Sequence, residues 1–283
     1  MWRGSFPFNY MEAVRRLLGE APTLLGASPS TTDILIPLAS NLTLPSWYHA
    51  LLRPFGRTTS AGVNGFASAP GYVAAEATLC CVKKPTKLNV SAARVLVERI
   101  VHAHDVGGSP SSAAPPTVDV LLVQRHPPSW AGPSSGRRIV NSDKLLQACL
   151  ASGRRCQMID FGAVPFGDSV RAVRSSGAIV GVHGAGLTNA IFMQPGANRP
   201  GEMRDAARRP PVMVEVLPRA FSKHAFGLIK FGFLPALGVR HARVTAPEAD
   251  PGCVGRARGL AEKLRDCDVK VEWRGIEKAI AGG

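Results

Sequence analysis

The sequence predicts an α/β fold in which helices cover both faces of a parallel sheet. From residue 118 onward, apolar runs of strand length alternate with segments of helical spacing, the pattern that βαβ crossovers produce. One strand candidate leads directly into the glycine-rich turn 181–186, and a helix is expected to leave that turn. With 283 residues, 45% hydrophobic and 19% charged, the chain can bury one large core or two smaller ones.

The first part of the chain predicts mixed α/β elements. The expected helices and strands there are 10–18 (helix), 34–38 (strand), 45–52 (helix), 72–82 (strand) and 91–102 (helix). In the last of these helices one side is formed by Val95, Leu96, Ile100 and Val101. Residues 107–117, rich in glycine, serine and proline, have the composition of a flexible linker. We therefore divide the chain into an N-terminal lobe over 1–106, this linker, and a C-terminal lobe over 118–283.

The C-terminal lobe is the more regular part. Strands are expected at 118–124, 155–159, 178–182 and 212–217. Helices are expected at 142–152, 167–174, 185–192 and 221–234. Either Asn141 or Ser142 can cap the first of these helices. Residues 126–136 and 198–211 are polar, proline-rich loops, and Val269–Val271 is a short strand candidate.

The formal net charge of +14 limits the classes of partner. A basic protein can bind nucleic acid, an anionic membrane surface or a phosphate-bearing ligand. Single-stranded nucleic-acid binders interleave a basic stripe with aromatic side chains, whereas the basic residues here are dispersed and aromatics make up only 6% of the chain. A phosphate-bearing small molecule, which needs only a few cations, is therefore favoured over nucleic acid.

The cysteines and the terminal segments bear on the compartment. None of the six cysteines forms a C-x-x-C pair, which argues against a zinc ribbon. Cys253 and Cys267 could bridge in an oxidising compartment, but buried free thiols are slightly favoured. The sequons at Asn41 and Asn89 add faint support for a secretory lumen. No signal peptide or membrane-spanning run is visible, so the chain is either soluble or lacks a natural N-terminal anchor.

The glycine turn is the first candidate site. Residues 181–189 read Gly-Val-His-Gly-Ala-Gly-Leu-Thr-Asn. A helix that starts here would direct unpaired N–H groups at an anion, while Gly184 and Gly186 would let a phosphate approach the backbone. His183 can donate to the same phosphate, and the pair Thr188-Asn189 can cap the helix or face a ligand. The spacing is not that of a dinucleotide fingerprint, so on physical grounds a turn without a ligand is equally plausible.

The wider motif resembles a known family. Residues 179–189, followed by Phe192-Met193 and Pro195-Gly196, closely resemble the signature of glycosyltransferase family 61. This family includes plant xylan arabinosyl- and xylosyltransferases and animal O-GlcNAc transferases of the secretory pathway. Two more elements fit in order and spacing: Arg125 with 137–141 (Arg-Arg-Ile-Val-Asn), and Val214-Glu215-Val216 with Pro218. The resemblance covers about 118–245 well and is looser before 118.

This resemblance implies a GT-B-like architecture with two Rossmann-like lobes, the N-terminal one short or incomplete. It implies inverting transfer of a sugar from a UDP-sugar to a hydroxyl of a glycan or glycoprotein, in the lumen of the Golgi or endoplasmic reticulum. Family members are usually longer and carry a membrane anchor, so we expect a fragment or a shortened gene product here. Residues 198–211 resemble an insertion near the site.

The residues expected to bind the donor are Arg125, Arg138, Asn141, His183, Gly184, Ala185, Gly186, Leu187, Thr188, Asn189 and Glu215. Arg125, Arg138 and His183 are the candidates for stabilising the charge of the leaving diphosphate. Asn141 could instead fix a loop or cap a helix. Glu215 could accept hydrogen bonds from ribose hydroxyls, and a structural ion pair is an equally good interpretation.

Neither the general base nor a metal site is identified by the sequence. His49, His102 and His104 are available, but a lone histidine is more often structural, and His183 suits phosphate contact better than proton abstraction. Asp266-Cys267-Asp268 matches an Asp-x-Asp metal motif only superficially, and we expect a turn there and no obligatory metal. A non-catalytic nucleotide-binding relic is the alternative to an active enzyme, and a basic nucleic-acid binder is a weaker one.

Overall fold

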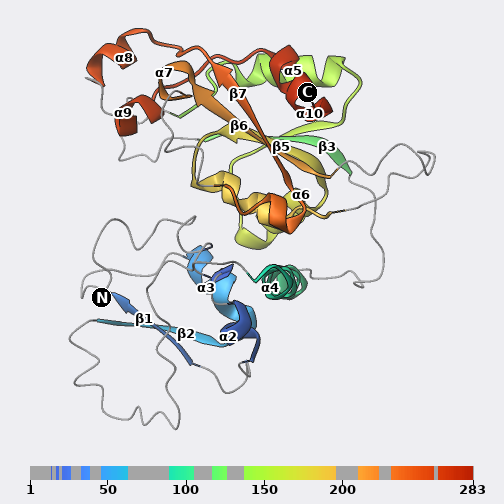
Figure 1. Ribbon diagram of the computed structural model, residues 1–283, viewed down its shortest axis with the longest axis vertical. Coiled ribbons are helices and arrows are strands. Elements are labelled where there is room, and N and C mark those ends of the chain that lie inside the picture. Colours follow the sequence, from blue (N-terminus) through green and yellow to red (C-terminus); the bar gives the residue numbers. More distant parts are fainter. Residues whose placement is uncertain are drawn as a thin grey trace. The chain divides into compact units, whose positions relative to one another are not determined.

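The computed structural model divides the chain into two compact units, residues 1–107 and 108–283 (Figure 1). The residues that the structure describes are 14, 17, 18, 21–26, 33–38, 46–62, 89–104, 117–125, 137–195, 210–222, 231–257 and 261–282. No helix within these ranges has both the length and the apolar character needed to cross a bilayer.

The first unit contains two parallel strands and several helices. Its elements are α2 (Ala21–Gly26), β1 (Asp33–Leu38), α3 (Ser46–Leu52), the 3-10 helix η1 (Arg53–Phe55), β2 (Arg57–Gly62) and α4 (Val90–His104). The strand expected at 34–38 and the helices expected at 45–52 and 91–102 are thereby confirmed. Of the helix expected at 10–18, the described residues Val14, Leu17 and Leu18 are helical, and the strand expected at 72–82 lies outside the described residues.

Helix α4 is held by a cap and by contacts with the helices before it. Asn89 accepts a hydrogen bond from the amide of Ala92 through Oδ1, at 3.0 Å, and so begins the helix. Leu96, Ile100 and Val101 are buried. Val95, expected on the same side, is 54% exposed, so this part of the prediction is wrong. The buried residues of α4 are Ala93, Leu96, Val97, Ile100, Val101 and His104, and at about 100° per residue Val95 lies on the opposite side of the helix from the centre of this stripe.

The second unit is built on a five-stranded sheet in which all the strands that pair are parallel, in the order β4-β3-β5-β6-β7. The strands are β3 (Val118–Val123), β4 (Cys156–Ile159), β5 (Ser176–Val182), β6 (Val212–Pro218) and β7 (Arg240–Ala246). The first four confirm the expected strands. β7 was not expected, because an edge strand that reads Arg-His-Ala-Arg-Val-Thr-Ala has no continuous apolar run.

Helices cover both faces of this sheet, as expected (Figure 1). α5 (Ser142–Ala151) and α10 (Trp273–Ala281) pack on one face, and α6 (Phe166–Arg174) packs with the 3-10 helix η2 (Ala185–Phe192) on the other. The first face contributes one residue in two from each strand to a continuous core, as the strand pleat requires. That core includes Val120, Leu122, Val180, Val214, Val216, Leu145, Cys149 and Ile276.

Two expected helices differ from the structure. Residues 185–192 form a 3-10 helix and not an α-helix, since glycine and β-branched residues within Ala-Gly-Leu-Thr-Asn-Ala-Ile-Phe weaken α-helical propensity. Of the helix expected over 221–234, Phe221 and Ser222 belong to α7 (Arg219–Ser222), residues 231–234 form a turn, contrary to the prediction, and residues 223–230 lie outside the described residues. The remaining elements are η4 (Pro235–Leu237), α8 (Gly252–Arg256) and α9 (Ala261–Arg265).

Two disulfides cross-link the second unit. Cys149 in α5 is bonded to Cys156 at the start of β4, and Cys253 in α8 is bonded to Cys267 after α9. The slight preference for free thiols at 253 and 267 was therefore wrong. Each bridge closes a short loop, with separations of 7 and 14 residues. A disulfide that closes a loop of this size stabilises a domain by about 2–3 kcal/mol, because it lowers the conformational entropy of the unfolded chain.

Gly181 is the glycine that the sheet needs most for close packing. A Cβ on it would lie 3.0 Å from the Cβ of Val123 and 3.2 Å from Cδ2 of Leu187. We predict that Gly181→Ala lowers the free energy of unfolding by about 1–3 kcal/mol, because neither neighbour can move without disturbing β3 or η2.

The control for this substitution is Gly275→Ala in α10. Its Cβ would meet only Val244 Cγ1, at 3.6 Å, so the gain in helix propensity should raise stability by about 0.5–1 kcal/mol. Urea denaturation of both variants measures these opposite signs. Equal effects of the two would show that the contact at 181 is unimportant.

Candidate functional site

The topology itself marks one place on the sheet. From β3 the chain moves outward to β4 and then returns past β3 to β5, so the direction of winding reverses between β3 and β5. In open α/β sheets, ligands bind outside the carboxyl ends of the strands at such a switch point. Arg125 follows β3 and His183 directly follows β5. The topology therefore brings two of the expected site residues to the same crevice.

The glycine turn between β5 and η2 is the accessible part of this region. Gly184, Ala185 and Gly186 are partly exposed, whereas Leu187, Thr188 and Asn189 are buried. Leu187 donates its amide to the carbonyl of Gly184 at 3.2 Å, which sets the first 3-10 turn. A Cβ at Gly184 would meet nothing closer than 3.6 Å and one at Gly186 nothing closer than 3.4 Å. The turn thus leaves room at its backbone, the condition for an anion to approach.

Thr188 and Asn189 face the interior. The Thr188 side chain is fully buried, and none of the described residues forms a hydrogen bond with its hydroxyl. Asn189 is 4% exposed. A buried hydroxyl without a partner requires water or a ligand group to satisfy it. The position of Thr188 next to the open turn makes it a candidate for such a contact.

A buried polar network joins three neighbouring strands beside the turn. Glu215, in β6, is completely buried and lies beside Gly181 in the strand register. One of its oxygens, Oε1, is hydrogen-bonded to Nδ1 of His183. The other, Oε2, accepts from Nε2 of His241 at 3.0 Å and from Nε of Arg243 at 3.1 Å. His241 and Arg243 lie on the edge strand β7, so this one carboxylate ties β5, β6 and β7 together.

The electrostatics of the network keep the carboxylate ionised. Burial alone would raise the pKa of Glu215, but hydrogen bonds from His183 and His241, with the charges of the same rings, outweigh it and lower the pKa from 4.5 to about 2. The rings of Phe221 and Phe231 lie 5.5 Å and 6.1 Å from that of His183. This apolar wall strengthens the interaction by excluding water.

The remaining ring nitrogen of His183 is available for a ligand. Nδ1 is committed to Glu215, while Nε2 has no hydrogen-bond partner within the described ranges. Nε2 accepts a hydrogen bond when the ring is neutral and donates one when it is protonated. His183 is only 3% exposed, so any ligand atom that it contacts must enter the turn.

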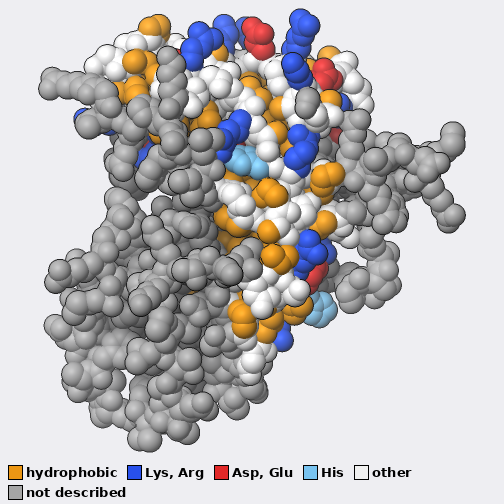
Figure 2. Space-filling model, in the orientation of Figure 1, with side chains coloured by type: hydrophobic (Ala, Val, Ile, Leu, Met, Phe, Trp, Pro, Cys, Tyr) orange, Lys and Arg blue, Asp and Glu red, His pale blue; other side chains and the backbone are white. Residues whose placement is uncertain are grey.

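A cluster of arginines lies at the same edge of the sheet. Arg137 donates from Nε to Oδ1 of Asp266 at 2.7 Å, and Arg265 donates to the same oxygen at 3.0 Å. Burial first, then the charge of Arg265 and that of Arg125, lower the pKa of Arg137 from 12.5, although Asp266 opposes this. Two guanidinium groups thus share one carboxylate oxygen, and the charge of a third, that of Arg125, acts on Arg137. Figure 2 shows basic side chains on both sides of a histidine on the visible face.

Arg138 points elsewhere, although it is the neighbour of Arg137. Its Nη2 and Nε donate to Oδ2 of Asp268 at 2.7 Å and 3.2 Å, and its amide donates to Oδ1 at 2.8 Å. These bonds use one edge of the guanidinium on Asp268. Arg137 has a backbone φ of 76°, a left-handed conformation that is uncommon for a residue with a side chain. This turn in the backbone separates the directions of the two side chains.

Asn141 anchors the C-terminal segment. Its Nδ2 donates to the carbonyl of Val271 at 2.8 Å and its Oδ1 accepts from the amide of Val271 at 3.0 Å. Asn141 stands at the N-cap position of α5 but forms no side-chain cap, so the capping hypothesis is wrong and the fixing hypothesis is correct. Together with the bridge between Ile139 and Val269, this contact holds residues 137–141 against the segment after α9.

The polar groups considered as metal ligands or as the general base are also placed by the structure. Both carboxylates of the Asp-x-Asp sequence are engaged by arginines, and the described residues hold no group of three or more potential metal ligands. His104 bonds through Nε2 to the carbonyl of Ala50 at 2.8 Å and is 9% exposed, which is a structural role. His49 and His102 are exposed. None of these three histidines is thereby marked as a base.

The structure therefore brings Arg125, His183 and the glycine turn to one edge and joins His183 directly to Glu215. It places Arg138 and Asn141 in contacts with the C-terminal segment. The residues that the sequence did not point to are Arg137, His241, Arg243 and Arg265. Arg137 was visible only as the first half of an Arg-Arg pair, and β7 gave no strand signal that would have placed His241 or Arg243 beside Glu215.

The Glu215 network supplies a prediction on stability. Glu215→Gln should lower the free energy of unfolding near neutral pH by about 3–5 kcal/mol, because it removes the anion that two histidines and an arginine face. The native carboxyl has the lower pKa, so its contribution is complete above about pH 4.5 and disappears as the pH falls toward 2. Urea denaturation should show the difference between wild type and variant shrinking with acidification.

The matched control is Glu277→Gln. Its carboxylate is 42% exposed and lies 3.8 Å from Arg154, so its loss should change stability by less than about 1 kcal/mol at any pH. A difference at Glu215 that does not vary with pH would contradict the assignment of the charge to that carboxylate.

A known protein family matches a large part of the chain. The family model described as Glycosyltransferase 61 matches residues 12–198, more than half of the chain. The matched span begins well before residue 118, includes Arg125, Arg137 and the turn at 184–186, and ends before Glu215. No curated protein matches the chain. The chain belongs to glycosyltransferase family 61.

Proposed function

We propose that this glycosyltransferase moves a sugar from a UDP-sugar to a hydroxyl of a glycan or glycoprotein, with inversion, and that the donor binds at the switch point between β3 and β5. Membership of the family gives the transferase activity. The observation that carries the donor site is the placement of Arg125 after β3 and of the partly exposed glycine turn after β5, the two strands at the switch point. Open α/β sheets bind ligands there.

The diphosphate is proposed to lie against Arg125 and Arg137. A nucleoside diphosphate gains negative charge as it leaves, so fixed cations beside it lower the barrier. Arg137 suits this role better than Arg138, which was the original candidate. Arg137 uses only Nε for Asp266, which leaves its terminal nitrogens for phosphate oxygens, whereas Arg138 gives Nε and Nη2 to Asp268.

His183 and the turn are proposed to complete the anion site. Residues 184–186 of the turn are partly exposed, His183 Nδ1 is used by Glu215 while Nε2 is not, and the buried Thr188 hydroxyl has no hydrogen-bond partner among the described residues. Glu215 acts through His183, since both of its oxygens are already occupied and no part of it is exposed. A direct contact between Glu215 and the ribose hydroxyls, which the sequence allowed, is less compatible with this burial.

Further features of the proposal come from the family resemblance and the cysteines. We infer a GT-B-like arrangement in which the other lobe supplies most of the acceptor site, and a general base that remains to be assigned. Arginines and the turn replace a metal at the diphosphate, so we infer that no metal is required. Two disulfides support an oxidising compartment such as the lumen of the Golgi or endoplasmic reticulum.

Titration calorimetry with UDP tests the donor site. Wild type should bind UDP, and Arg137→Ala should bind it about 10–100-fold more weakly, because one charge-assisted contact is lost. Arg155→Ala is the control, since Arg155 pairs with Asp119 at the opposite, amino edge of the sheet. It should bind UDP as wild type does. A folded wild-type protein that does not bind UDP would refute the donor assignment.

The alternative is a nucleotide-binding relic without catalytic activity. Both hypotheses predict UDP binding, so the second measurement is turnover: hydrolysis of UDP-sugars, and transfer to a panel of oligosaccharides. Turnover that Arg137→Ala abolishes supports the enzyme. Binding without turnover of any donor supports the relic.

A further inference from the structure

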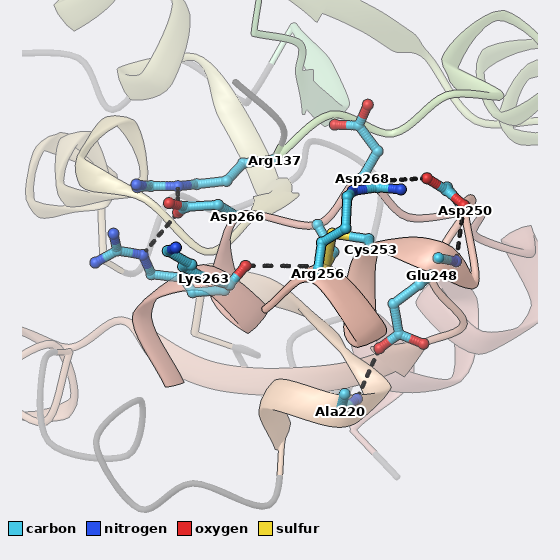
Figure 3. The surroundings of a disulfide bond; sticks show 12 residues. Arg137, Ala220, Glu248, Asp250, Cys253, Arg256, Lys263, Asp266 and Asp268 are labelled. Atoms are coloured by element: carbon cyan, nitrogen blue, oxygen red, sulfur yellow. Dashed lines mark hydrogen bonds and ion pairs between the residues drawn. A yellow bond between two sulfur atoms is a disulfide. The ribbon is translucent and has the colours of Figure 1, made fainter. Parts of the chain in front are cut away.

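The disulfide between Cys253 and Cys267 lies beside the arginine cluster. Cys267 is 1% exposed and sits between Asp266 and Asp268, the two residues that hold Arg137 and Arg138. Figure 3 shows the bridge with Arg137 and Asp266 on one side and the Arg256–Asp250 pair on the other. The cross-link is therefore one residue away from both carboxylates that contact the consecutive arginines.

The segment that carries these carboxylates has little internal structure. α9 (Ala261–Arg265) and α8 (Gly252–Arg256) have only five residues each. Helices of this length are not stable by themselves in water. Between Arg265 and the start of α10, regular pairing is limited to single bridges at Val269. The position of Asp266 therefore depends on what fixes Cys267.

The Cys253 side of the bridge is anchored to the sheet. Asp250 accepts from the amide of Gly252 at 2.8 Å and pairs with Arg256 at the other end of α8. Glu248, two positions after the end of β7, forms a β-bridge with Val269. Its carboxylate accepts a hydrogen bond from the amide of Ala220 at 2.7 Å. These contacts connect α8 to the carboxyl ends of β6 and β7.

The Cys267 side transmits this anchor to the arginines. Val269 donates its amide to the carbonyl of Arg138 at 2.9 Å and accepts from the amide of Val140 at 3.0 Å. Asp268 binds the amide and side chain of Arg138, and Asp266 binds Nε of Arg137. The two aspartates thus hold the two arginines, and their own segment is tied to the chain after β7 by the bridge at Val269 and, through α8, by the disulfide.

We propose that the Cys253–Cys267 disulfide is a positioning element of the donor site, which acts by fixing Asp266 and, through it, the guanidinium of Arg137. This inference rests on the proposed donor site. Asp266 is then a positioning residue: it opposes part of the positive charge that attracts an anion, but it holds Arg137 by Nε and does not use its terminal nitrogens. Orientation outweighs the charge that Asp266 neutralises.

The chain provides its own control in the second disulfide. Cys149 and Cys156 join the end of α5 to the start of β4, at the amino edge of the sheet, away from the switch point. Its loop is also short, so its removal should lower the melting temperature by a comparable amount. Removal of the Cys149–Cys156 bridge affects the amino edge of the sheet, whereas removal of the Cys253–Cys267 bridge affects the carboxyl edge.

The experiment compares Cys253→Ala/Cys267→Ala with Cys149→Ala/Cys156→Ala. UDP affinity is measured by calorimetry at a temperature where near-ultraviolet circular dichroism shows both variants folded. We expect the first to bind UDP at least about tenfold more weakly and the second to stay within about twofold of wild type. Equal losses in the two variants would mean a general effect of stability and would overturn the proposal.

Hydrogen exchange gives a readout that does not depend on the donor. Loss of the 253–267 bridge should speed exchange of the amides of Arg138 and Val140, which are bonded to Asp268 and Val269, while loss of the 149–156 bridge should not. Unchanged protection at these amides overturns the positioning role. A wild type that fails to bind UDP, with this exchange pattern present, refutes the donor site and leaves the positioning role standing.

Asp266→Asn tests the same idea with both disulfides intact, which also covers the case in which a cysteine variant does not fold. If Asp266 positions Arg137, UDP binding weakens; if it only neutralises charge, UDP binding becomes tighter because the site is more positive. Asp266→Glu should restore part of the affinity. Tighter binding by Asp266→Asn would refute the positioning role.

Discussion

The buried carboxylate of Glu215 is the interaction on which the second unit depends. It sits in the middle of three neighbouring strands and satisfies groups from two of them, one histidine at the end of β5 and a histidine and an arginine on β7. A charge with no exposed surface is tolerable only because these partners surround it. The same contacts explain how an edge strand with two arginines and a histidine pairs with a fully buried neighbour. Since His183 begins the glycine turn, the carboxylate also fixes where the turn starts.

The turn and the arginines then follow from the order of the strands. Reversal of winding between β3 and β5 opens a crevice at their carboxyl ends, and the residues that immediately follow these strands are placed at its rim. Arg125 and His183 reach the crevice in this way, with no long-range contact required. Arg137 reaches it differently, through Asp266 and a left-handed backbone turn. Residues in sparsely populated backbone conformations cost of order 1–3 kcal/mol and are often found at functional sites. The positions of Arg125 and His183 are thus set by the order of the strands, whereas the position of Arg137 is set by tertiary contacts.

This division explains what the sequence could predict. The apolar runs of β3 to β6 and the spacing of α4, α5 and α6 are local patterns, and each was located to within about two residues, the usual uncertainty of element ends. β7 was missed because Arg240, His241 and Arg243 interrupt its apolar residues. The 3-10 form of η2 was missed because propensity alone does not distinguish it from a short α-helix. Within the site, Glu215 and His183 were recognised as residues, but their direct bond could not be, since it joins positions 32 apart in sequence. The choice between Arg137 and Arg138 depends on two aspartates about 130 residues away, for which the sequence contains no local signal.

Arg137 and Arg138 are consecutive in the sequence but make different contacts. Asp268 binds one edge of the Arg138 guanidinium group. This contact and the Asn141–Val271 pair join residues 137–141 to the C-terminal segment. Arg137 is held by a single nitrogen, in a group of cations that one carboxylate does not neutralise. A fully neutralised cluster would be more stable without a ligand and would bind an anion more weakly, because the ligand would have to displace an existing partner. Incomplete neutralisation therefore has a cost to the folded chain, and the disulfide one residue from Asp266 is positioned to offset it. The stability of this segment and the orientation of Arg137 are therefore set by the same few contacts.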